Sequence, residues 1–170
     1  MKLLLLASLF VGLSLSAAPK VGDAAPLFEA PKQDGKLFKL EERRGKGWTV
    51  LFFYPKAGTP GCTKQACAFR DAIKTIREKQ AEVFGMSADT VEKQAKFHAE
   101  HKLQFDLLAD PKAETIEKYG AKFPLMDMAK RWTFILDPDL KIRWIDDNVD
   151  PAMDPKKVSE ALGQLQAKKS

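Results

Sequence analysis

The chain has 170 residues and a formal net charge of +5, and 45% of its residues are hydrophobic and 30% charged. This length and composition fit one globular domain and exclude a disordered or fibrous chain. Two cysteines exclude a disulfide-rich mini-protein, and a small net charge without a basic cluster does not suggest a partner nucleic acid.

Residues 1–18 have the pattern of a secretory signal peptide. Lys2 carries their one charge, a largely apolar run from Leu3 to Leu15 follows, and small residues end the segment. The run is shorter than the about 20 apolar residues that span a bilayer. We therefore expect an exported protein, periplasmic or secreted, with one domain over residues 19–170 and no membrane segment in its mature form. A buried N-terminal helix or strand and a retained membrane anchor are the alternatives.

The next segments predict a strand, a loop and a helix. Residues 19–31 suggest an extended lead-in, and Asp34-Gly35 indicates a turn. A continuous apolar run over residues 49–54 is typical of a strand buried on both faces, and Pro55 ends it. A loop with Gly58, Pro60 and Gly61 leads to a helix over about residues 62–79, whose apolar residues recur at helical spacing.

The rest of the chain continues the alternation of strands and helices. Asp89, with Glu92 three positions later, predicts the N-cap of a helix that reaches about His101. Gly120 predicts the C-terminal cap of another helix. The remaining elements are strands over 81–88 and 105–109, a helix over 113–119, strands over 132–136 and 141–145 joined by a turn at 137–139, and a helix from Pro155 to about Ala167.

This order predicts an α/β fold with helices on both faces of one sheet. Strands that alternate with helices form a mainly parallel sheet, and the late hairpin adds antiparallel strands at one side. We expect a three-layer α/β/α sandwich with a mixed central sheet.

Cys62 stands where the loop after a buried strand enters a helix. A cysteine in a first helical turn meets unpaired N–H groups and the positive end of the helix dipole, which favour the thiolate, the nucleophilic form. A helical wheel places Cys62 on the apolar stripe and Cys67 on the polar side.

Cys67 follows Cys62 by five positions, a spacing that a regular helix cannot bridge with a disulfide. Residues five apart have Cα atoms roughly 8–9 Å apart, and a disulfide needs less than about 7 Å. A bond between them requires the first turns to unwind, so it would be a labile bond. A structural disulfide and two unrelated free thiols are the alternatives.

The segment 54–67, Tyr-Pro-Lys-Ala-Gly-Thr-Pro-Gly-Cys-Thr-Lys-Gln-Ala-Cys, resembles the active-site segment of peroxiredoxins, in particular those of the bacterioferritin-comigratory-protein or peroxiredoxin Q type. The resemblance extends over roughly residues 20–165, through the strand over 49–55, Leu-Leu-Ala-Asp at 107–110 and Arg-Trp-Thr-Phe-Ile-Leu at 131–136. It implies a thioredoxin-like fold, which agrees with the order of elements.

The resemblance also implies roles for five residues. Cys62 would be the peroxidatic cysteine and Cys67 the resolving cysteine. Thr59 would hydrogen-bond the thiolate and the peroxide, Pro60 would shield the site, and Arg131 would favour the thiolate and polarise the peroxide. Each of the last three has an ordinary alternative role in a loop, a turn or a strand end, and Lys130 competes with Arg131. Gln65 departs from the glutamate common in the family.

The function that follows is reduction of hydrogen peroxide and organic hydroperoxides, without a cofactor or metal. The resemblance implies a thioredoxin-like thiol reductant and a monomer, although an exported enzyme needs a reductant outside the cytoplasm. The alternatives are a thioredoxin-like thiol–disulfide oxidoreductase of exported proteins and a binding domain with a structural disulfide. The four-residue spacer between the cysteines disagrees with the Cys-x-x-Cys pair of the oxidoreductase.

Overall fold

A five-stranded sheet runs through the middle of the structure, with strand order β5-β4-β3-β6-β7. The computed structural model describes residues 17–168 of the chain. The parallel strands are β3 (Trp48–Phe53), β4 (Ala81–Ser87) and β5 (Asp106–Ala109), and the antiparallel strands are β6 (Trp132–Leu136) and β7 (Ile142–Asp146). The predicted mixed sheet, with its hairpin at one side, is confirmed.

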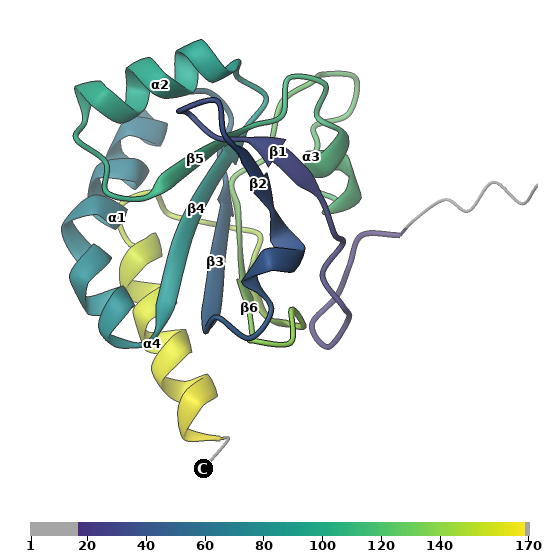
Figure 1. Cartoon of the computed structure of the whole chain (residues 1–170), viewed down its shortest axis with the longest axis vertical. Coiled ribbons are helices and arrows are strands. Elements are labelled where there is room, and N and C mark those ends of the chain that lie inside the picture. Colours follow the sequence, from purple (N-terminus) through teal and green to yellow (C-terminus); the bar gives the residue numbers. More distant parts are fainter. Residues whose placement is uncertain (1–16, 169–170) are drawn as a thin grey trace, which may run out of the picture.

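The central strand β3 supplies side chains to two separate cores, because neighbouring residues of a strand point to opposite faces. Val50 and Phe52 pack with three helices on one face. Leu51 and Phe53 pack on the other face, which α3 and the first two strands cover (Figure 1). The helices are α1 (Pro60–Glu78), α2 (Val91–Glu100) and α4 (Asp154–Ala167) on the first face, and α3 (Glu114–Lys118) on the second. The predicted three-layer sandwich is therefore confirmed.

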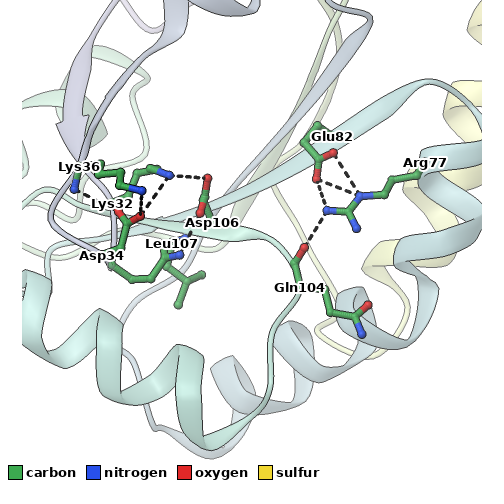
Figure 2. Close-up of polar contacts among 9 residues, drawn as sticks. Lys32, Asp34, Lys36, Arg77, Glu82, Gln104, Asp106 and Leu107 are labelled. Atoms are coloured by element: carbon green, nitrogen blue, oxygen red, sulfur yellow. Dashed lines mark hydrogen bonds and ion pairs between the residues drawn. The ribbon is translucent and has the colours of Figure 1, made fainter.

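The lead-in before β3 contains a hairpin that the sequence pattern did not reveal. Strands β1 (Glu29–Pro31) and β2 (Leu37–Lys39) pair across the expected turn, and the 3-10 helix η1 (Leu40–Arg43) follows. Lys32 approaches Asp106 of β5 to 3.3 Å (Figure 2). Figure 2 also shows Arg77, near the end of α1, which lies 2.7 Å from Glu82 of β4.

The helices begin within two residues of the predicted positions, and two of the differences have a clear physical reason. Helix α1 begins at Pro60 rather than near Cys62, because Pro60 has a suitable φ and needs no N–H partner in the first turn. Thr90, not Asp89, is the N-cap of α2, and its side chain accepts a hydrogen bond from the Lys93 amide. Gly120, with φ of 71°, follows α3 as expected. None of the helices within residues 17–168 is long and apolar enough to cross a membrane.

Candidate active site

Cys62 is the third residue of α1, and its side chain points into the core. The residue is 1% exposed and packs in the same apolar cluster as Phe52, Tyr54 and Phe69. The predicted inward orientation of Cys62 is therefore confirmed. Since α1 begins at Pro60, the sulfur lies in the first turn, where unpaired backbone N–H groups favour a negative charge.

Arg131 is the cation beside this sulfur. It immediately precedes β6, and Trp132 pairs with Phe53 at the end of β3, the strand that leads to α1. This register brings Arg131 to Cys62, and its Nη2 donates a hydrogen bond to Cys62 Sγ at 3.4 Å. Lys130, the competing assignment, instead places its Nζ 5.4 Å from the centre of the Trp132 ring.

Behind Arg131, a chain of buried polar groups reaches α4. Arg131 Nη1 donates to Gln65 Oε1 at 2.5 Å, and Gln65 Nε2 donates to Asp154 Oδ2 at 2.6 Å. Thr133 Oγ1 donates to the same carboxylate oxygen at 2.8 Å. Gln65 lies one turn after Cys62 on α1, a spacing that could have indicated its place in the site. Asp154 and Thr133 carry no such local signal.

Asp154 is a fully buried carboxyl group with incomplete hydrogen bonding. Its Oδ1 has no hydrogen-bond partner among the described residues. Burial raises the pKa of Asp154 to about 6, and the negative charge of Asp146 adds to the rise. Hydrogen bonds from Gln65 and Thr133 oppose the rise, as does the charge of Lys157.

A second buried network holds the loop before α1. Asp89 Oδ2 accepts hydrogen bonds from the Ala57 amide at 2.7 Å and from Ser87 Oγ at 2.8 Å. The Tyr54 hydroxyl donates to Gln94, whose Nε2 donates to Ser87 Oγ at 2.9 Å. Asp89, expected as a helix cap, therefore anchors the loop.

Thr59 and Pro60 lie at the junction of this loop with α1. Thr59 is the N-cap residue, but its side-chain oxygen accepts no hydrogen bond from a helix amide. Its hydroxyl instead donates to the Lys56 carbonyl at 2.9 Å. The oxygen of this hydroxyl keeps lone pairs that can accept a hydrogen bond. Pro60 is exposed and is the first residue of α1.

Cys67 lies in α1 and is half-buried, whereas Cys62 is buried, and both are free thiols. Because the helix is regular from Pro60 to Glu78, the two sulfurs cannot bond without local unwinding. Arg70 lies in the turn of α1 after Cys67. Its guanidinium donates hydrogen bonds to the Asp71 carboxylate at 2.8 Å and to the His101 carbonyl at 3.0 Å. The site thus offers one shielded nucleophile and one sulfur nearer the solvent.

The chain is similar to known proteins in both sequence and fold. The AhpC/TSA family model matches residues 21–145. A putative peroxiredoxin of Mycobacterium tuberculosis is 42% identical over 126 residues, which cover 72% of this chain and 82% of the relative. Peroxiredoxin Bcp of Escherichia coli is 37% identical over 135 residues, which cover 76% of this chain and 86% of the relative.

A solved structure is similar as well. The crystal structure of peroxidoxin BcpB from Mycobacterium tuberculosis superposes with a TM-score of 0.81 at 37% identity. The match covers 85% of this chain and 97% of that chain. The sequence and the fold therefore lead to the same group of proteins.

The raised pKa of Asp154 predicts a specific pH dependence of stability. Between about pH 4 and pH 6 the folded protein keeps a proton on Asp154 that the unfolded chain has lost, because the pKa rises from 3.8 to about 6. The retained proton stabilises the folded protein fully below the pKa that Asp154 has in the unfolded chain. This stabilisation, up to about 3 kcal/mol, is lost as the pH rises through the pKa of Asp154 in the folded protein. The free energy of unfolding is measured in urea for the wild type and for Asp154→Asn. From about pH 4 to about pH 7, the wild type should lose stability relative to the variant.

Asp150→Asn is the control for this measurement, because Asp150 is an exposed carboxylate of the preceding loop that accepts from the Ala152 amide. Its unfolding free energy should follow the wild type across the same pH range. Parallel curves for the wild type and Asp154→Asn would contradict the assignment of a shifted pKa to Asp154.

Proposed function

The chain belongs to the AhpC/TSA family and is a peroxiredoxin, a thiol-dependent peroxidase, and we propose that Cys62 is the sulfur that attacks the peroxide. The observation that carries this proposal is the hydrogen bond of 3.4 Å from Arg131 to the buried Cys62 sulfur. A permanent positive charge and the positive end of α1 both stabilise a thiolate. The relatives favour a peroxidase over a thiol–disulfide oxidoreductase of exported proteins.

The first step is attack of the Cys62 thiolate on one peroxide oxygen. The sulfur gives an electron pair to that oxygen, the O–O bond breaks, and the leaving oxygen departs as water or an alcohol after it gains a proton. Cys62 becomes a sulfenic acid. Arg131 would stabilise the negative charge that develops on the leaving oxygen, and Thr59 would accept the peroxide O–H.

Cys67 would complete the cycle as the resolving cysteine. Its thiolate attacks the sulfur of the Cys62 sulfenic acid, hydroxide leaves as water, and a disulfide forms. A dithiol reductant of the thioredoxin type then returns two electrons. Because Cys67 is more exposed than Cys62, Cys67 is the sulfur that a protein reductant can reach first.

Both cysteines belong to one helix, so no second chain needs to supply a thiol. We therefore propose a monomeric catalytic unit that reduces hydrogen peroxide and organic hydroperoxides. The buried position of Cys62 favours small peroxides that can reach a sulfur shielded by the core.

Cysteine variants test these roles directly. Reduced wild type mixed with hydrogen peroxide in a stopped-flow instrument should consume one equivalent and end as a monomeric disulfide. Cys62→Ser should consume none, and Cys67→Ser should stop at a sulfenic acid that dimedone labels. Peroxide consumption by Cys62→Ser at the wild-type rate, or a disulfide-linked dimer on a non-reducing gel, would contradict the assignment.

The disulfide form has a second signature, because bond formation requires the start of α1 to unwind. Amide hydrogen exchange between Cys62 and Cys67 should be faster in the oxidised wild type than in the reduced protein. Cys67→Ser treated with peroxide is the control and should keep the slow exchange. Equal protection in the reduced and disulfide forms would rule out unwinding.

We also propose that residues 1–18, of which 1–16 lie outside the described residues, direct export of this peroxiredoxin. Expression of the full sequence should give a protein outside the cytoplasm whose N-terminus, read by mass spectrometry, lacks the leader. Leu5→Arg, which places a charge in the apolar run, should retain the uncut chain in the cytoplasm. Recovery of the uncut wild type from the cytoplasm would refute export.

A further inference from the structure

Asp154 is the end of the chain of hydrogen bonds that begins at the Cys62 sulfur. Arg131 donates to both Cys62 and Gln65, and Gln65 donates to Asp154. We propose that Asp154 is a positioning residue: its Oδ2 holds the Gln65 amide so that the amide oxygen faces Arg131 and keeps the guanidinium on the sulfur. The proposal rests on the proposed role of Cys62.

The direction of each hydrogen bond fixes the orientation of the Gln65 amide. A guanidinium has donors alone, and an ionised carboxylate has acceptors alone. Gln65 lies between them and has one donor end and one acceptor end. In the observed orientation both ends are satisfied. A reversed amide would face Arg131 with its NH₂ group and Asp154 with its oxygen, which leaves buried polar groups without partners.

Thr133 connects a third element of the fold to Asp154 Oδ2. Its hydroxyl donates to Asp154 Oδ2 at 2.8 Å. Thr133 belongs to β6 and follows Arg131 by two positions in the sequence. Gln65 belongs to α1 and Asp154 is the first residue of α4. The oxygen therefore links the helix that carries Cys62 to the strand that Arg131 immediately precedes.

Packing of α4 against α1 does not explain why the Asp154 carboxyl group is buried. Helix α4 meets the core through Val158, Ala161 and Leu162, which pack in the same apolar cluster as Cys62. A buried carboxyl group with one oxygen unpaired, as in Asp154 within residues 17–168, is costly. Apolar replacements of buried charges are often neutral or stabilising. Asp154 also lies outside residues 21–145, which match the family model. Its position in the chain of hydrogen bonds gives the group a role.

The experiment compares two substitutions in a Cys67→Ser background, where Cys62 is the one remaining thiol. Asp154→Leu keeps the approximate shape and removes the acceptor, whereas Asp154→Asn can keep an acceptor oxygen toward Gln65 and Thr133. We expect Asp154→Leu to slow alkylation of Cys62 by iodoacetamide near neutral pH about tenfold, and to slow its reaction with hydrogen peroxide similarly. Asp154→Asn should stay within about twofold of the parent.

Coupling to Arg131 separates positioning from a general structural effect. In an Arg131→Met background, Asp154→Leu should cause no further loss, because the group on which it acts is gone. Asp150→Asn, in the loop before α4, should react at the parent rate. An unchanged rate in Asp154→Leu, an equal loss in Asp154→Asn, or losses that add in the double variant would each overturn the proposal.

Circular dichroism shows whether Asp154→Leu is folded. Should it not fold, Gln65→Met interrupts the chain one link earlier, and an unchanged alkylation rate in that variant overturns the proposal. Alkylation does not involve peroxide, so the two claims can fail separately. A wild type that alkylates normally and consumes no peroxide refutes the peroxidase, whereas normal peroxide consumption with unchanged alkylation in Asp154→Leu refutes positioning by Asp154.

Discussion

The antiparallel pairing of β6 with β3 is the constraint on which the site depends. The pair Phe53 and Trp132 places the start of β6 beside the end of β3, from which the chain turns into α1. Arg131 and Cys62, 69 positions apart in sequence, therefore meet at one end of the sheet, 3.4 Å between nitrogen and sulfur. A buried sulfur, a permanent cation and the positive end of a helix therefore meet at one point of the fold. The chemistry of the proposed peroxidase follows from this juxtaposition.

Two networks of buried side chains hold this arrangement. Asp89 and Ser87 anchor the loop before α1, and Gln65 and Asp154 hold the guanidinium behind the sulfur. Hydrogen bonds between buried side chains fix the positions of those side chains, which suits a site that must hold an attacking thiol in place. The proposed disulfide with Cys67 places the opposite demand on the same helix, because α1 must unwind. We infer that the enzyme alternates between a rigid reduced site and a locally unfolded oxidised one.

Local patterns were sufficient to predict the fold and the orientation of Cys62. The apolar run before Pro55 predicted a strand buried on both faces, and the helical stripe placed Cys62 inward, as the structure confirms. The resemblance identified Arg131, which β6 brings to the sulfur.

Asp154 could not be found in this way, since an Asp-Pro pair at a helix start has an ordinary local explanation and its partner Gln65 is 89 positions away. Asp89 was misread as a cap for the same reason, because its partner Ala57 is 32 positions away. The hairpin β1–β2 was missed because its strands have three residues each, too few for a pattern.

We infer that the charge of Arg131 activates Cys62, and the rate of the first peroxide step measures this activation. Stopped-flow measurement of the reduced protein with hydrogen peroxide compares the wild type with Arg131→Met and with Lys130→Met, which removes the neighbouring charge that lies over Trp132. We expect Arg131→Met to lower the second-order rate constant about a hundredfold. Lys130→Met should leave that constant within about twofold of the wild type, because the Lys130 Nζ lies over the Trp132 ring. Equal rate constants for the wild type and Arg131→Met, or equal losses in the two variants, would contradict this inference.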